Sequence, residues 1–166
     1  SALSDADLIV GIGSGVIQDL CKYVSFESKI PYIIVATAPS MDGYASASSS
    51  MTREGLKISL ASRAPDVIIG DTDILCKAPL KMMKSGLGDM LAKYIGLCEW
   101  RMVELIGGEY RCENVAALMR SSVDKIVANA PGLRRREPAA VQATVEGLVL
   151  SGIAMSYAGS SRPASR

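Results

Sequence analysis

The sequence predicts an α/β fold in which a partial, doubly wound parallel sheet is followed by an all-helical part. Three apolar runs, at residues 8–12, 30–36 and 67–70, have the length and continuity of strands that are buried on both faces. From Ala78 onwards, apolar residues instead recur at steps of three and four, which is the period of helices. Strands that alternate with helices indicate a parallel sheet, and the later change of period indicates a second, helical unit.

The first half contains the strands. Residues 8–12 lead through a glycine-rich turn into a helix with apolar residues at helical spacing, and residues 30–36 supply the next buried strand. Residues 57–61 alternate like a further strand of this sheet, and a turn at residues 64–66 precedes the run at 67–70.

The second half predicts helices only. Gly86 and Gly88 punctuate its first stretch into two helices. The later expected helices are 113–129, closed by Pro131 and Gly132, and 138–158. The predicted boundary near residues 73–79 divides the chain into a domain at 1–76 and a domain at 77–166.

Composition narrows the classes of function. Lys and Arg number 18 against 17 for Asp and Glu, so no global positive charge attracts nucleic acid or an acidic membrane, and the expected partner is a small molecule. The four cysteines form no close pair, which argues against a zinc knuckle, a redox CxxC motif or a disulfide framework and favours a reducing cytoplasm. We expect neither a signal peptide nor a membrane span, because no apolar run approaches about 20 residues.

The chain contains no histidine. Histidine is the usual general acid or base near neutral pH and the commonest metal ligand. A site formed wholly within this chain must therefore use Asp, Glu, Lys, Tyr, Ser or Cys.

The loop at residues 37–46, Thr-Ala-Pro-Ser-Met-Asp-Gly-Tyr-Ala-Ser, directly follows the predicted strand at 30–36. Ligands bind beyond the carboxyl ends of strands in open α/β sheets, so a loop there that carries hydroxyls and one carboxylate is a candidate binding site. Pro, Gly, Ser and Asp are also ordinary turn residues, and a plain connecting loop explains this segment equally well.

The glycines in Gly11-Ile12-Gly13-Ser14-Gly15 lie between a strand and a helix, where backbone amides can surround a phosphate. The segment departs from the dinucleotide fingerprint, which has glycine where this chain has Val16, and it lacks the Walker lysine. Glycines that merely turn a strand into a helix are the alternative. Asp19, expected in the first turn of that helix, could simply favour the positive end of the helix dipole.

Asp89 is expected near the start of a helix. A carboxylate there is commonly a cap or a dipole partner, and Lys93, one turn later, would be its ion-pair mate. The alternative is a functional carboxylate, although a lone carboxylate is no metal site.

Four blocks taken together are recognisable, and they occur in the order GIGSGVIQD, TAPSMDGYAS, DTDIL and GLGDMLAKY. In this order and spacing they resemble the sn-glycerol-1-phosphate dehydrogenases, a branch of the superfamily of iron-containing alcohol dehydrogenases, glycerol dehydrogenases and dehydroquinate synthases. The resemblance implies a dehydroquinate synthase-like architecture, with a partial Rossmann-like dinucleotide domain at 1–76 and a partial helical metal and substrate domain at 77–166. It also implies NAD(P)-dependent interconversion of dihydroxyacetone phosphate and sn-glycerol 1-phosphate, in the cytoplasm and for phospholipid biosynthesis, and it leaves room for a homo-oligomer.

The resemblance also implies roles for individual residues. Asp42 would contact the substrate, and Asp89 would bind both the substrate oxygen and a divalent metal, usually zinc or nickel with iron as a further option. These two aspartates are the expected catalytic residues. The residues expected along NAD(H) or NADP(H) are Gly13, Gly15, Val16, Ile17, Gln18 and Asp19 at the pyrophosphate, and Thr37, Ser40 and Ser46 at the nicotinamide.

The sequence departs from that family at its metal site, which uses Asp plus two histidines. Both histidines are missing here, and the stretch at 160–166 resembles the one that precedes the first of them in the relatives. We therefore expect a chain truncated at both ends that is inactive alone. Alternatives are a glycerol or other polyol dehydrogenase, the elimination and cyclisation of a dehydroquinate synthase, or a non-catalytic nucleotide-binding remnant.

Overall fold

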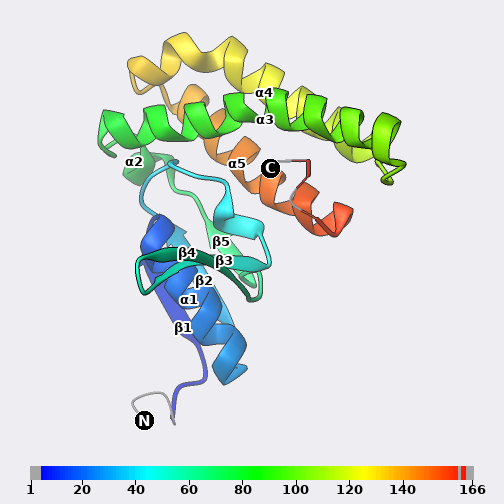
Figure 1. Cartoon of the computed structure of the whole chain (residues 1–166). Coiled ribbons are helices and arrows are strands. Elements are labelled where there is room, and N and C mark those ends of the chain that lie inside the picture. Colours follow the sequence, from blue (N-terminus) through cyan, green and yellow to red (C-terminus); the bar gives the residue numbers. More distant parts are fainter. Residues whose placement is uncertain (1–4, 161, 164–166) are drawn as a thin grey trace.

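The computed structural model describes residues 5–160 and 162–163, so most of the stretch at 160–166 and the first four residues lie outside it. A sheet-containing half and a layer of long helices meet at a narrower middle (Figure 1). The elements, in chain order, are β1 Ile9–Gly13, α1 Gly15–Ser28, β2 Tyr32–Ala36, the 3₁₀ turn η1 Gly43–Ala45, β3 Ser48–Arg53, β4 Leu56–Ala61, β5 Val67–Ile69, α2 Thr72–Leu75, α3 Leu80–Gly107, α4 Glu113–Arg134 and α5 Pro138–Ala158.

The apolar runs form a parallel sheet, as predicted, and its strand order is β1-β2-β5. The expectation that these strands are buried on both faces is wrong for the two edge strands, because Val10, Ile12, Val67 and Ile69 are 43–66% exposed. Ile9 to Gly13 pair in register with Tyr32 to Ala36, and Val67 to Ile69 pair with the other edge of β2. The central strand β2 alternates between fully buried Tyr32, Ile34 and Ala36 and half-buried neighbours. The α/β class, with a parallel sheet followed by helices, is confirmed.

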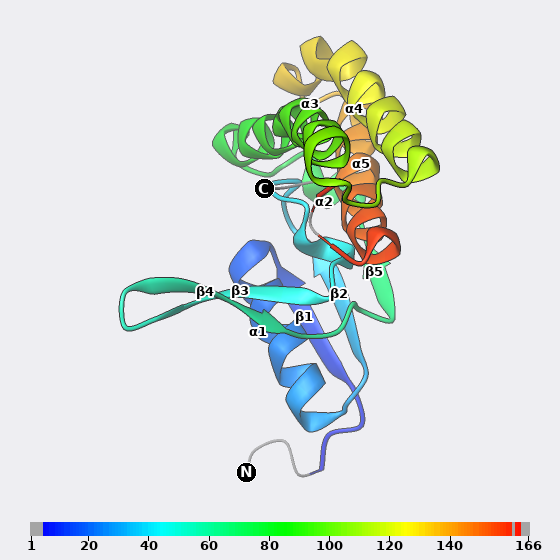
Figure 2. The ribbon, with the colours of Figure 1, turned by 45° about the vertical axis from the view of Figure 1, so that its right-hand side comes forward.

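A correction concerns the strand at residues 57–61. It exists as β4, but it pairs antiparallel with β3 in a separate two-stranded sheet instead of joining the parallel one. Glu54 and Gly55, both with positive φ, form the tight turn between the two strands. This β3–β4 hairpin projects beside α1 (Figure 2).

A second correction concerns Gly86 and Gly88, which do not divide two helices. Helix α3 runs unbroken from Leu80 to Gly107, so Asp89 lies in its third turn and is no helix cap. Gly86 packs against the loop at 37–46, where a Cβ atom would come within 2.0 Å of the Pro39 carbonyl oxygen. The glycine is thus required by a close approach of helix to loop.

A further expectation changes in helix α4, which continues through Pro131 to Arg134 instead of closing at Pro131-Gly132.

Helix α5, at 21 residues, is long and apolar enough to cross a membrane by length and composition. Its apolar character has a structural reason, because 56% of its most apolar stretch is buried within the protein, where it packs on α4, α3 and η1. The expectation that the chain has no membrane span stays a prediction.

The two halves share apolar contacts. One core cluster joins Tyr32 and Ile34 of the sheet to Met83 of α3 and Val141 of α5. A second cluster, around Met90, Trp100 and Met119, holds the helices together. The division at 76/77 stays a prediction, since α5 contributes to both clusters.

Candidate active site

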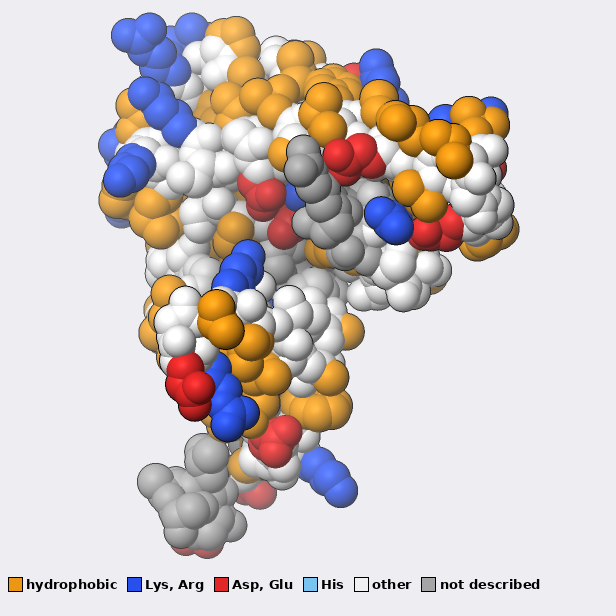
Figure 3. All heavy atoms as spheres, in the orientation of Figure 1, with side chains coloured by type: hydrophobic (Ala, Val, Ile, Leu, Met, Phe, Trp, Pro, Cys, Tyr) orange, Lys and Arg blue, Asp and Glu red, His pale blue; other side chains and the backbone are white. Residues whose placement is uncertain are grey.

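A cleft of about 790 Å³ opens where the sheet half meets the helices. Acidic and basic side chains gather in this hollow on the face shown in Figure 3. One wall is formed by α1, the loop at 37–46 and the β3–β4 hairpin, and the other by α3 with one residue of α5. The polar residues that line it are Asp19, Lys22, Ser40, Asp42, Ser46, Ser48, Ser50, Lys57, Ser59, Asp89, Lys93 and Glu99.

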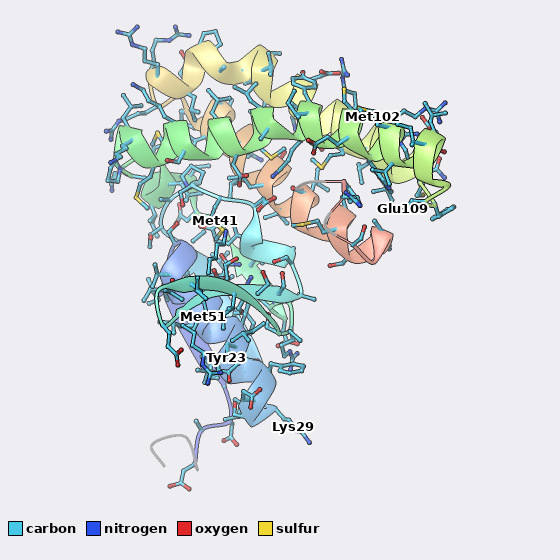
Figure 4. All side chains as sticks on the ribbon, viewed as in Figure 1. Tyr23, Lys29, Met41, Met51, Met102 and Glu109 are labelled. Atoms are coloured by element: carbon cyan, nitrogen blue, oxygen red, sulfur yellow. The ribbon has the colours of Figure 1, made fainter. Side chains whose placement is uncertain are left out.

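The loop at 37–46 is held against the end of β1. The Thr37 N–H donates to the Gly13 carbonyl at 3.1 Å, and the hydroxyls of Ser40 and Ser14 lie 2.6 Å apart. The buried Tyr44 hydroxyl donates to the Ala38 carbonyl at 2.7 Å. Met41 lies between α1 and the helical layer (Figure 4). These contacts fix the loop so that Asp42 faces α3.

Asp42 and Asp89 meet across the cleft and share one lysine. The Asp42 backbone N–H donates to Oδ2 of Asp89 at 2.8 Å. Lys93 Nζ donates to Asp42 Oδ2 at 2.6 Å and to Asp89 Oδ1 at 2.9 Å, and the lysine is only 1% exposed. Ser151 of α5 also donates to Asp42 Oδ2, at 3.0 Å. Side chains from α3 and α5 therefore converge on the Asp42 carboxylate of the loop.

The electrostatics of Asp89 follow from this packing. Burial raises the pKa of its carboxyl above the ordinary value, and the Asp42 charge raises it further. The Lys93 ammonium and the Asp42 N–H partly offset these effects. Two carboxylates against one ammonium leave an excess of one negative charge when both are ionised, which suits a ligand that supplies hydroxyl donors or positive charge.

Lys22 forms a second buried cluster, which sequence reasoning missed. It is fully buried and pairs with Asp19 at 2.9 Å. Its ammonium also donates to the Gly43 carbonyl at 3.0 Å, to the Ser46 hydroxyl at 3.2 Å and to the Ser48 carbonyl at 2.5 Å. The spacing of Asp19 and Lys22 at i and i+3 was the available signal, but their burial depends on the hairpin.

The N-terminus of α1 faces the cleft without a side-chain cap. Ser14 occupies the cap position, but its hydroxyl is engaged with Ser40 and the Ala38 carbonyl. The first backbone N–H groups of the helix are therefore left to bind an anion, so this end of the cleft fits a pyrophosphate. Gly15 lines the cleft there.

Gly11 and Gly13 have a packing explanation. A Cβ atom on Gly11 would meet the Cys21 sulfur at 2.8 Å, and one on Gly13 would meet Ile17 at 2.6 Å. Both glycines let α1 lie close to β1.

Of the residues expected at a ligand, Gly15, Asp19, Ser40, Ser46, Asp42 and Asp89 line the cleft. The other expected residues, Gly13, Val16, Ile17, Gln18 and Thr37, do not. Val16 and Ile17 are exposed, whereas Gln18 is buried and donates to the Gly43 carbonyl at 2.8 Å. Asp19 lies in the second turn of α1, so the expectation of a first-turn dipole partner was wrong.

The described residues do not by themselves fit a divalent metal. Within residues 5–160 and 162–163, no group of three His, Cys, Asp or Glu side chains gathers in one place. Asp89 could supply one ligand, but both its oxygens already accept hydrogen bonds. We derive no chemical step through a metal from these residues.

Comparison with known sequences decides the relationship. Residues 1–79 match the family model described as iron-containing alcohol dehydrogenase. The glycerol-1-phosphate dehydrogenase [NAD(P)+] of Methanothrix thermoacetophila is 39% identical over 160 residues, which cover 96% of this chain and 45% of that protein. The same enzyme of Hyperthermus butylicus is 40% identical, over 95% of this chain and 45% of its own length. The chain is therefore similar in sequence to glycerol-1-phosphate dehydrogenases over nearly its whole length. It spans less than half the length of these relatives.

Solved structures support the same fold. Glycerol dehydrogenase from Schizosaccharomyces pombe matches with a TM-score of 0.75 at 24% identity, over 90% of this chain and 41% of that one. The iron-containing alcohol dehydrogenase from Thermotoga maritima matches with a TM-score of 0.70 at 17% identity, over 92% of this chain and 46% of that one. The predicted resemblance is therefore confirmed for sequence and fold.

Proposed function

We propose that this chain forms part of an NAD(P)-dependent dehydrogenase that interconverts dihydroxyacetone phosphate and sn-glycerol 1-phosphate. The observation that carries the proposal is the meeting of Asp42 and Asp89 over the buried Lys93, in a cleft that also contains the uncapped end of α1. The homology to glycerol-1-phosphate dehydrogenases supports the choice of substrate.

The nucleotide would lie along the wall formed by α1 and the loop. The turn from Gly15 to Asp19 would lie along its pyrophosphate, and the free N–H groups of Gly15, Val16 and Ile17 would bind the phosphate oxygens, since a helix N-terminus favours negative charge. Ser40 and Ser46, which line the cleft, and the backbone at Thr37 would contact the nicotinamide end. NAD(H) and NADP(H) are both compatible with these contacts.

The two aspartates would orient the substrate against the nicotinamide. Their carboxylates accept hydrogen bonds from substrate hydroxyls, while Lys93 and Ser151 hold the Asp42 side chain in one orientation. Such positioning brings the reacting carbon of the substrate next to the hydride donor. Holding two reactants in the correct geometry supplies a large part of the rate enhancement of an enzyme. A zinc, nickel or iron ion at Asp89 would need further ligands from outside the described residues.

The test is reduction of dihydroxyacetone phosphate by NADH and NADPH, with zinc or nickel supplied. We expect the protein produced at the length of its relatives to turn over, and the 166 residues alone to be inactive because they contain no histidine. Asp89→Asn should lower kcat/KM about 100-fold or more, whereas Glu27→Gln, at an exposed position outside the cleft, should leave it unchanged. An Asp89→Asn variant of the longer protein that keeps wild-type activity would overturn the assignment.

Two alternatives give different results in the same assays. Turnover of glycerol in preference to glycerol 1-phosphate would favour a polyol dehydrogenase. Calorimetric binding of NADH without turnover of either compound, by the longer protein, would favour a non-catalytic nucleotide-binding module.

A further inference from the structure

The cleft-facing side of the β3–β4 hairpin carries three hydroxyls and one ammonium. The register places Ser50 opposite Ser59, and Thr52 opposite Lys57. Side chains alternate between the two faces of a strand, so Ser48 and Ser50 of β3 share one face with Lys57 and Ser59 of β4. All four are exposed and line the cleft.

Lys57 differs from the other two lysines of the cleft in its partners. Lys22 is neutralised by Asp19, and Lys93 is shared by Asp42 and Asp89. Within the part of the chain that the structure describes, Lys57 makes no hydrogen bond and no ion pair. Its positive charge is therefore available to a ligand in the cleft.

We propose that Lys57, with the hydroxyls of Ser48, Ser50 and Ser59, binds a phosphate monoester and thereby selects a phosphorylated substrate. An ammonium flanked by hydroxyl donors matches the charge and the acceptor oxygens of a phosphate. The inference rests on the proposed function, since it concerns the phosphate of dihydroxyacetone phosphate and glycerol 1-phosphate.

The opposite wall of the cleft favours one orientation of a phosphorylated substrate. The excess negative charge around Asp42 and Asp89 repels a phosphate and accepts hydroxyl groups. A short substrate with a phosphate at one end and a hydroxyl at the other is thus held with its phosphate toward the hairpin and its hydroxyl end toward α3. A polyol without phosphate leaves Lys57 in water, so it gains nothing from this wall.

A phosphate monoester could also come from the 2′-phosphate of NADPH, and the experiment separates the two sources. The protein at the length of its relatives is compared as wild type, Lys57→Ala and Lys57→Arg. The matched control is Arg53→Ala, because Arg53 is an exposed cation of the same hairpin that does not line the cleft. For each, kcat and KM are measured for dihydroxyacetone phosphate and for dihydroxyacetone, with NADH and with NADPH.

Lys57→Ala should lower kcat/KM for dihydroxyacetone phosphate about 10-fold to 100-fold through KM, as expected for the loss of a charge-assisted hydrogen bond. The value for dihydroxyacetone should change less than twofold. Lys57→Arg should retain most of the activity, and Arg53→Ala should behave as wild type. The inhibition constant of inorganic phosphate should rise in parallel in Lys57→Ala, which gives a readout that does not need turnover of the unphosphorylated ketone.

The outcomes separate failure of this inference from failure of the proposed function. Absence of wild-type turnover of dihydroxyacetone phosphate refutes the proposed function, and this inference with it. Wild-type turnover with less than a twofold effect of Lys57→Ala refutes only the role of Lys57. A loss that appears with NADPH and not with NADH places the phosphate on the cofactor and also overturns selection of the substrate.

Discussion

The two walls of the cleft each bury one lysine beside the loop at 37–46, but they use it differently. On the sheet wall, Lys22 meets one carboxylate and otherwise donates to two backbone carbonyls and a serine hydroxyl. On the helical wall, Lys93 meets two carboxylates, one from the loop and one from its own helix. Both lysines are almost wholly removed from solvent.

The two lysines therefore have different roles: Lys22 is an anchor of the loop, whereas Lys93 belongs to a binding centre. Lys22 and Asp19 balance in charge, and the other hydrogen bonds of this ammonium hold the chain at Gly43 and Ser48 in place. The Lys93 group has a surplus of carboxylate oxygen that lines the cleft, so it can accept a ligand. The same residue type thus fixes the loop on one wall and balances part of the charge of a polar site on the other.

The largest effect should follow removal of Lys93. Lys93→Met leaves Asp42 and Asp89 facing each other without a counter-charge, and breaking a buried ion pair in this way costs about 3–5 kcal/mol. Urea unfolding followed by circular dichroism measures the loss of free energy of unfolding.

The control for that variant is Lys93→Met combined with Asp42→Asn, which removes one of the two opposed charges. This double variant should recover part of the lost stability, because only one carboxylate then remains unpaired. A loss below about 1 kcal/mol in Lys93→Met would show that the group is not held by charge.

A smaller effect is expected on the sheet wall. Lys22→Met removes one of the two donors to the Ser48 carbonyl and leaves the Ser46 hydroxyl there at 3.3 Å. Gln18 stays on the Gly43 carbonyl, and Asp19 can still reach water. We expect a loss of about 1.5–3 kcal/mol, the cost of losing hydrogen bonds made by a charged group.

Asp19→Asn is the matched variant for Lys22, and it should cost less because Asp19 is partly exposed. A loss for Lys22→Met that equals or exceeds that for Lys93→Met would remove the distinction between anchor and binding centre.

Local patterns predicted the parts of the fold that depend on local sequence. The strands β1, β2 and β5 were recognisable because continuous Val and Ile runs are typical of parallel strands covered by helices. Strand β3 was missed because its residues, Ser48 to Arg53, are mostly polar and show no apolar alternation. The unbroken course of α3 was missed because Gly86 is explained by contact with Pro39, which lies 47 positions earlier in the chain.

Prediction of the site was limited in the same way, because local patterns do not reveal contacts between residues that are distant in sequence. Asp42 and Asp89 were named through the resemblance, and the pairing of Asp89 with Lys93 followed from helical spacing. The bond from Lys93 to Asp42 joins residues far apart in sequence, and no local pattern reveals it. Nothing in the sequence indicated a role for Lys57 either, since an exposed lysine on a strand is ordinary until its place in the cleft is known.

The third prediction tests whether the helical wall must touch the loop. Gly86→Ala places a methyl group against the Pro39 carbonyl, so helix and loop must separate, at about 1–3 kcal/mol. Gly88→Ala is the control on the same helix, because a Cβ atom there meets nothing within 4 Å. Alanine at position 88 should stabilise the protein by about 0.5–1 kcal/mol, as expected for an exposed helix interior. Thermal unfolding of both variants measures the contrast, and equal effects would rule out the close approach.

The smallest effect compares one thiol from each half of the molecule. The Val115 N–H at the start of α4 lowers the pKa of the Cys112 thiol, whereas burial raises the pKa of the Cys21 thiol, on the side of α1 that faces β1. The thiolate is the reactive form, so alkylation of Cys112 by iodoacetamide should reach its half-maximal rate at a lower pH than alkylation of Cys21. Mass spectrometry of peptides after timed alkylation between about pH 6 and pH 10 gives both profiles. Cysteine-to-serine variants at each position assign the signals, and a profile for Cys21 at or below that for Cys112 would contradict the contrast between the helix start and the packed sheet half.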